Sequence, residues 1–264
     1  MMDKLKDKKV VITGASSGIG ELMAYEVAAK GGKPILLARS YDKLLKIAEN
    51  ISEQTGVTPL IFKLDVSDGD AVEKVFTTIK SSVGNVDILI NNAGYARFEL
   101  AHEATMETVE SMFKVNVFGS IACTQAVLEN MLTEDHGHII FIASQAGKLA
   151  TPKSSVYSAT KHALLGFANS LRMELANTGI KVSTVNPGPI RTEFFRIADK
   201  TGSYEKNVEK FMLDPKVVAM KTIGLIENPK RELNLPRWMG IGTKLYQLFP
   251  TLVEKVAGEQ FRKK

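Results

Sequence analysis

Tyr157 and Lys161 are the residues whose types and spacing most directly suggest chemistry. They lie four residues apart in the stretch 156–175, whose pattern predicts a helix, so they share one helix face. A free phenol loses its proton only at about pH 10, but a nearby ammonium favours the phenolate. The pair could therefore exchange a proton with the oxygen of a carbonyl or an alcohol. The Tyr-x-x-x-Lys pattern alone also arises by chance, as a packed tyrosine beside a surface lysine.

Ser144 and Asn116 are polar residues in apolar surroundings. Ser144 ends the apolar run 138–144, which predicts a buried strand, and the preceding strand ends in Asn-Asn-Ala-Gly at 91–94. Parallel strands in such sheets bind ligands at their carboxyl ends, so the Ser144 hydroxyl could bind a substrate oxygen or simply cap the strand. Asn116 lies in an apolar helical stretch, 115–132, and there it needs a hydrogen-bond partner, structural or functional.

A glycine-rich turn, Thr-Gly-Ala-Ser-Ser-Gly-Ile-Gly at 13–20, joins a predicted strand (9–13) to a predicted helix (18–30). Glycine permits a tight turn and close approach of a ligand, and the helix N-terminus offers free N–H groups and a positive dipole end. The turn predicts a pyrophosphate site, although it could also serve as a tight strand–helix connection.

Arg39 indicates which dinucleotide that turn would bind. In NAD-type sites an acidic residue stands about 20 residues beyond the glycines and holds the ribose hydroxyls. Here the second strand, 34–38, is followed by Arg39 and Ser40, with no carboxylate. A guanidinium can bind a 2′-phosphate through two hydrogen bonds. We therefore expect NADP(H) to be preferred, with NAD(H) as the alternative; a solvated arginine would look the same.

The elements that must position these residues alternate along the chain. Continuous apolar runs predict strands at 9–13, 34–38, 59–65, 86–91, 138–144 and 181–186, and a weaker one at 231–235. Helical patterns lie at 18–30, 40–54, 71–81, 115–132 and 155–175. Continuous runs suit strands buried on both faces. We expect an α/β, three-layer Rossmann fold: a doubly wound, seven-stranded, mostly parallel sheet with helices on both faces, in one domain spanning 1–264.

Composition excludes several other classes of protein. The chain has 264 residues, 44% hydrophobic and 24% charged, typical of a globular protein and not of a disordered one. Cys123 is the only cysteine, so we expect no disulfide and a reducing, cytoplasmic location. His136 and His138 have no third ligand nearby in sequence, so we expect no metal site. No apolar run is long enough for a signal peptide or a membrane span.

The charge is uneven. Residues 236–264 contain six basic and two acidic residues, and so carry +4 of the net charge of +5. We therefore expect no nucleic-acid surface, because the basic excess is confined to one end. That end is also amphipathic, predicted as two short helices. It could cover a substrate cleft, pack on a partner subunit, or lie on a membrane surface.

Taken together, the motifs resemble the short-chain dehydrogenase/reductase (SDR) family. The glycine turn, Asn91 to Gly94, Asn116, Ser144, Tyr-Ser-Ala-Thr-Lys at 157–161 and Asn-Pro-Gly-Pro-Ile-Arg-Thr at 186–192 follow the family's order and spacing. The resemblance covers about 9–235. It implies hydride transfer between a nicotinamide and a carbonyl or secondary alcohol, and a homodimer or homotetramer.

The resemblance also implies residue roles. Tyr157 would be the catalytic acid/base, Lys161 would lower its pKa and hold the nicotinamide ribose, Ser144 would orient the carbonyl oxygen, and Asn116 would anchor a water in a proton relay. The implied cofactor-binding residues are Gly14, Ser16, Ser17, Gly18, Ile19, Gly20, Arg39, Ser40, Asp65, Val66, Asn92, Ala93, Gly94, Tyr157, Lys161, Pro187, Gly188, Ile190 and Thr192. Ser17 departs from the basic residue that many NADP-type members have there.

The C-terminal residues indicate which branch of the family the chain resembles. The ending resembles the hydroxysteroid dehydrogenase and carbonyl reductase branch more than the 3-oxoacyl-carrier-protein reductases. Residues 191–214 are expected to form a substrate lid with an apolar lining, and 236–264 a basic amphipathic extension. We therefore expect a substrate with apolar bulk. The alternatives are a lipid or steroid ketone reductase at a membrane surface, a 3-oxoacyl-carrier-protein reductase, and a redox-inactive NADP-binding regulator.

Overall fold

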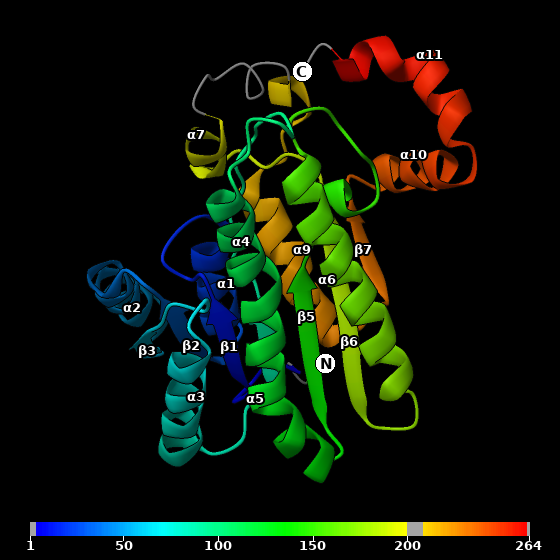
Figure 1. The fold of residues 1–264 in the computed structure, drawn as a ribbon. Helices are drawn as coiled ribbons and strands as arrows, with labels where there is room; N and C mark the ends of the chain where they lie inside the picture. The colour runs from blue at the N-terminus through cyan, green and yellow to red at the C-terminus, as the bar shows by residue number, and fades with distance from the viewer. Residues whose placement is uncertain (1–3, 200–207, 263–264) are drawn as a thin grey trace.

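A computed structural model describes residues 4–199 and 208–262, with side chains described as far as residue 256. Its centre is a seven-stranded sheet in the order β3-β2-β1-β4-β5-β6-β7 (Figure 1). The strands are β1 (Lys9–Thr13), β2 (Lys33–Ala38), β3 (Leu60–Lys63), β4 (Ile88–Asn91), β5 (Gly137–Ile142), β6 (Ile180–Pro187) and β7 (Glu232–Leu235). Every neighbouring pair is parallel. This confirms the expected Rossmann-like fold.

Helices cover both faces of the sheet because successive strand residues point to opposite sides. Val10 and Ile12 of β1 belong to one core and Val11 belongs to the other. The first core packs α1 (Gly18–Ala29), α2 (Tyr41–Thr55) and α9 (Pro215–Glu227). The second packs α3 (Gly69–Val83), α5 (Gly119–Thr133) and α6 (Ser155–Glu174). Cys123 of α5 is fully buried in the second core.

Two helices were not expected from the sequence. The helix α4 (Met106–Phe113) begins at Thr105, whose side chain accepts a hydrogen bond from the Thr108 N–H. The helix α9 begins at Asp214, which caps the Lys216 N–H, and has Pro215 in its first turn. Both starts carry a recognisable capping residue. Helix α4 runs into α5 through a π-helical turn, η1 (Lys114–Phe118).

The strand limits also differ from those expected. Strand β5 stops at Ile142 and β4 begins only at Ile88. Ser144 therefore lies beyond β5 and caps a short 3₁₀ helix, η2 (Gln145–Gly147), instead of ending the strand. An apolar run continues past the ladder wherever the chain remains buried, so the run alone does not mark the strand end.

The chain ends in two short helices, α10 (Arg237–Leu248) and α11 (Pro250–Arg262), as expected for the tail. In Figure 1 they lie on the β7 side, and α11 reaches the carboxyl end of the sheet, where α7 (Phe194–Ala198) also lies. Within 4–199 and 208–262, no helix combines the length and apolarity needed to cross a bilayer. The same residues contain no group of three or more potential metal ligands. Residues 200–207 of the expected lid lie outside the described part.

The turns after β1 and β4 approach each other closely at Gly14. Its φ is +65°, and a Cβ atom there would lie 2.9 Å from the Ala93 Cα. Gly56, at the end of α2, has a similar φ of +73° but nothing within 4 Å. Gly14 is therefore required both for its backbone conformation and for space, whereas Gly56 is required for conformation alone.

These two glycines form a matched pair for a stability test. We expect Gly14→Ala to lower the free energy of unfolding by about 2–5 kcal/mol, because left-handed strain adds to overpacking. Gly56→Ala should cost only the strain, about 1–2 kcal/mol. Urea unfolding of both variants measures the difference, and equal losses would show that the approach to Ala93 does not constrain the fold.

Candidate active site

Helix α6 carries Tyr157 and Lys161 to the carboxyl edge of the sheet. The Lys161 side chain is buried, and its Nζ donates a 2.8 Å hydrogen bond to the Ile142 carbonyl at the end of β5. The same Nζ lies 5.8 Å from the centre of the Tyr157 ring. Burial lowers the pKa of Lys161 to about 8, because the charged form loses hydration. The structure thus brings together the two residues expected to move a proton.

Asn116 links this helix to the loop after β4. It lies in the π-helical turn η1 and is fully buried. Its Oδ1 accepts from the Tyr95 N–H at 2.9 Å, and its Nδ2 donates to the Tyr95 carbonyl and to Thr160 Oγ1. Both amide hydrogens are therefore used within the protein. The side chain has only acceptor capacity left for a water, so its clearest contribution here is to fix the loop against α6.

Gly94 marks the point where three expected site residues converge. A Cβ atom on Gly94 would lie 3.1 Å from Asn116 Oδ1 and 3.6 Å from Lys161 Nζ. The carboxyl end of β4, the π-helical turn and α6 therefore meet there. A side chain at Gly94 would crowd both polar groups.

Ser144 lies on the next loop, at the start of η2. Its Oγ accepts a 3.0 Å hydrogen bond from the Ala146 N–H and lies 3.5 Å from the Pro187 carbonyl. The second contact is long for a hydroxyl donor, so the hydroxyl hydrogen is only weakly held. A Cβ atom on Gly147 would lie 2.8 Å from the Lys161 carbonyl, so η2 packs directly on α6. Ser144 is thereby placed near the Tyr157 helix.

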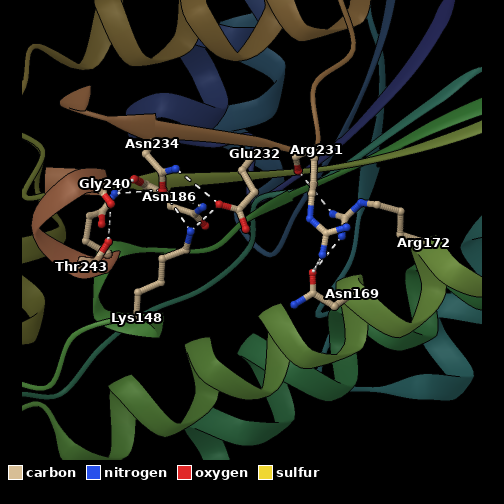
Figure 2. Close-up of polar contacts among 10 residues, drawn as sticks. Lys148, Asn169, Arg172, Asn186, Arg231, Glu232, Asn234, Gly240 and Thr243 are labelled. Carbon is tan, nitrogen blue, oxygen red and sulfur yellow. Dashed lines mark hydrogen bonds and ion pairs between the residues drawn. The ribbon is translucent and has the colours of Figure 1, made fainter. Parts of the chain in front are cut away.

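A polar cluster behind η2 holds this loop in place (Figure 2). Asn234 Oδ1 of β7 accepts from the side chains of Gln145 (3.3 Å), Lys148 (3.2 Å) and Asn186 (3.1 Å). Lys148 also pairs with Glu232. Burial alone would raise the pKa of Glu232, but the hydrogen bond and charge of Lys148 lower it. We call Gln145, Lys148, Asn186, Glu232 and Asn234 the β7 polar cluster.

Helix α10 is packed onto this region. A Cβ atom on Gly240 would lie 2.8 Å from the Asn234 Cβ, and one on Gly188 would lie 2.7 Å from the Met239 Sδ. The loop after β6, which includes the expected residues Pro187 and Gly188, is therefore in contact with the first helix of the tail.

The glycine turn has the features of an anion site. Ser17 is the N-cap of α1, but its side chain makes no capping hydrogen bond, so it does not occupy the first-turn N–H groups. Gly18 has φ +60°, and a Cβ there would lie 3.7 Å from the Thr192 Cγ2. The loop after β6, where Ile190 pairs with Leu213, thus faces the turn. These residues, with Ser16, Ile19 and Gly20, fit a bound pyrophosphate.

Thr13 supports this turn, although the sequence motifs alone give it no role. Its Oγ1 accepts from the Asn92 and Ala93 N–H groups at 3.0 and 2.9 Å. Asn92 Nδ2 in turn donates to the carbonyls of Thr13 and Gly14. A buried threonine at a strand end was the available signal. These hydrogen bonds hold Asn92 and Ala93 against the glycine turn, which is a structural role in addition to the expected cofactor contact.

Arg39 directly follows β2, and Asp65 lies two residues beyond the end of β3. Arg39 is 77% exposed, and its Nη1 is 3.9 Å from Asp65 Oδ2. Asp65 Oδ1 accepts from the Ser67 N–H and hydroxyl. Ser40 is the N-cap of α2, while the Val66 side chain is buried in the core. Arg39, Ser40, Asp65 and Val66 therefore all lie beyond the carboxyl ends of β2 and β3. The exposed Arg39 side chain is free to change its orientation.

An aromatic cluster covers Tyr157. Phe98 and Phe194 lie 6.0 and 5.9 Å from the Tyr157 ring, and Phe195 contacts both of these phenylalanines. Phe194 and Phe195 begin α7, within the expected lid. The described part of the lid therefore places apolar surface over the phenol.

Similarity to known proteins shows the family of the chain. Residues 8–201 match the short chain dehydrogenase family. An uncharacterised oxidoreductase of Staphylococcus saprophyticus is 36% identical over 86% of this chain and 94% of its own. A Drosophila melanogaster dehydrogenase/reductase, SDR family protein 7-like, is 40% identical over 72% of this chain. That match spans only 60% of the fly protein.

Solved structures are similar as well. An alcohol dehydrogenase of Thermococcus sibiricus, complexed with 5-hydroxy-NADP, has a TM-score of 0.78 at 28% identity, covering 87% of this chain and 95% of that one. A serine dehydrogenase complexed with NADP⁺ has a TM-score of 0.77 at 32% identity, covering 86% and 93%. The chain thus belongs to the short-chain dehydrogenase family, as an oxidoreductase that acts on CH–OH groups.

Proposed function

We propose that the protein is an NADP(H)-dependent oxidoreductase that interconverts a carbonyl and a secondary alcohol with apolar bulk. The observation that carries this proposal is the buried Lys161 ammonium, held by the Ile142 carbonyl close to the Tyr157 ring. A redox-inactive regulator on the same fold would not need to bury that cation, because burying a charge is costly.

The residues act as follows in this proposal. A bound nicotinamide supplies hydride-transfer chemistry at the carbonyl carbon. Tyr157 donates the proton to the substrate oxygen in reduction and takes it back in oxidation. Lys161 stabilises the phenolate that forms and holds the nicotinamide ribose. Ser144 orients the substrate oxygen through its weakly held hydroxyl, and Asn116 holds the β4 loop and α6 in register, with its remaining acceptor turned to a relay water.

The cofactor preference rests on Arg39. Its exposed guanidinium and long contact with Asp65 leave it able to pair with a 2′-phosphate. The similar alcohol dehydrogenase and serine dehydrogenase structures contain 5-hydroxy-NADP and NADP⁺, respectively. The actinorhodin polyketide ketoreductase solved with NADPH is also similar, at a TM-score of 0.79 and 28% identity. Together with Arg39, these NADP-bound structures support a preference for NADP(H) in the present chain, although another similar structure contains NAD.

The substrate class rests on the aromatic cluster. Phe98 and Phe194 lie against Tyr157, so a substrate whose oxygen reaches the phenol would contact apolar side chains. This favours ketones or aldehydes of the kind used by hydroxysteroid dehydrogenases and carbonyl reductases. Turnover only of small charged ketones would argue against an apolar substrate. Turnover only of 3-oxoacyl thioesters would indicate a 3-oxoacyl-carrier-protein reductase instead.

We also propose a homodimer or homotetramer in the cytoplasm. Phe118, Leu132 and Met173, on η1, α5 and α6, are exposed apolar residues on the helices that pair subunits in the family. The lone cysteine suits a reducing compartment.

Replacing Tyr157 tests the chemical step. Tyr157→Phe should keep cofactor binding and lower kcat with an apolar ketone by about 10²–10⁴-fold, the usual contribution of a proton-transfer group. Tyr25→Phe on α1 is the matched control and should keep full turnover. The measurements are steady-state rates and a cofactor titration. Full activity of Tyr157→Phe would remove Tyr157 from the mechanism.

The pH profile tests the Lys161 environment. Because burial lowers the pKa of Lys161 to about 8, the Tyr157–Lys161 pair should lose its first proton near that pH. Ketone reduction, which needs the proton, should fall as the pH rises through about 8, and alcohol oxidation should rise. Initial rates in both directions check this. Parallel profiles in the two directions would contradict a shared proton.

Thermal unfolding tests the cofactor preference. A ligand that binds only the folded state stabilises it by about 2.7 kcal/mol at 100 times its Kd. NADPH should therefore raise the Tm more than NADH at equal concentration. Arg39→Ala should remove most of that difference, whereas Lys221→Ala on α9, an equal loss of charge, should not. A larger shift with NADH would reverse the preference and leave the family assignment unchanged.

A further inference from the structure

The outer sides of α10 and α11 carry exposed apolar residues. They are Trp238, Ile241, Leu245 and Leu248 on α10, and Leu252 and Val256 on α11, between 51% and 80% exposed. We call these six residues the C-terminal apolar face. The spacings of three and four residues place each set on one side of its helix. In Figure 1 the two helices project from the body of the molecule beyond β7.

The inner side of α10 is already used for packing. Gly240 and Thr243 are buried, and Gly240 lies against Asn234 of the β7 polar cluster. The Tyr246 hydroxyl donates to Glu254 at 2.9 Å, which links α10 to α11. Polar and small residues therefore contribute to the orientation of the pair, while each of the six apolar side chains remains more than half exposed.

The charge around the face shows which kind of surface it suits. Arg237, Lys244 and Lys255 are exposed beside it, and residues 236–264 carry a net charge of +4. Apolar side chains that include a tryptophan, next to basic residues, are characteristic of helices that lie in the headgroup region of a bilayer. Each basic residue there is attracted by anionic lipids.

A second copy of the chain is a poorer occupant. A two-fold interface brings the same patch from each subunit together, so Arg237, Lys244 and Lys255 of both copies would approach one another. Like charges repel in that arrangement, whereas an anionic lipid surface neutralises them.

The face is continuous with the lid. The Phe211 ring, in the short helix η3 (Glu209–Phe211), lies 6.3 Å from the Trp238 ring, and both side chains are exposed. A surface that binds Trp238 would therefore also contact Phe211, near the end of the lid.

We propose that α10 and α11 bind the surface of an anionic lipid bilayer through the C-terminal apolar face and its basic border. The helices lie in the plane of the headgroups, with the carboxyl edge of the sheet beside the membrane. This contact requires neither cofactor nor substrate and stands apart from the proposed reaction.

Vesicle sedimentation with the full chain, without cofactor, tests the proposal. The protein should pellet with vesicles of phosphatidylcholine and phosphatidylserine at low salt, and much less with pure phosphatidylcholine or at high salt. Lys244→Glu/Lys255→Glu should weaken the anionic binding by at least about tenfold. Leu245→Ser/Leu252→Ser should weaken it by a similar factor.

Matched controls lie on α9. Met220 is 50% exposed and Leu245 is 51% exposed, so Met220→Ser removes a comparable apolar group, and Lys221→Glu reverses a comparable charge. Neither should change vesicle binding. Thermal unfolding confirms that each variant is folded.

Three outcomes would overturn the proposal. One is no binding of the wild type to anionic vesicles at low salt. Another is equal loss of binding in the α9 controls. The third is a change of molecular mass, measured by light scattering, in Leu245→Ser/Leu252→Ser with vesicle binding unchanged, which would make the face an interface between copies. None of these results bears on turnover, so the proposed reaction stands or falls separately.

Discussion

The hydrogen bond from Lys161 to the Ile142 carbonyl is the contact on which the site depends. A buried ammonium is costly unless it is paired, so α6 must cross the carboxyl end of β5 at one distance. That requirement explains the tight packing around it. Gly94 and Gly147 lack side chains where the β4 loop and η2 approach this helix, and Asn116 joins the β4 loop to Thr160, one residue before Lys161.

The β7 polar cluster extends this constraint to the end of the chain. Gln145 follows Ser144 directly, Asn186 is on β6, and Asn234 is on β7, yet the three side chains meet at one oxygen. Because Gly240 has no side chain, α10 can pack closely against Asn234. The loop that carries Ser144, the loop after β6 and the tail are therefore parts of one packed unit. Helix α10 thus packs on residues that also hold two loops of the site.

The sheet could be predicted from the sequence because strands buried on both faces leave continuous apolar runs, as at 34–38 and 138–144. Helices α4 and α9 were missed because their capping signals, Thr105 and Asp214, are short and common. Candidate site residues that lie close together within one motif, such as Tyr157 and Lys161, could be predicted from motif spacing. Their partners could not, since Thr13 and Asn92 are 79 residues apart, and Gln145 and Asn234 are 89 apart. Spacing along the chain carries no information on such pairs.

Cys123 adds a property of a different kind. It is the only thiol, it is fully buried on α5, and burial raises its pKa to about 12, so almost none is present as the reactive thiolate at neutral pH. Thiol-specific reagents consequently find no reactive cysteine in the described part of the native protein. Labelling of this sulfur requires the second core to open, so the rate of Cys123 labelling measures how often that core becomes exposed to solvent.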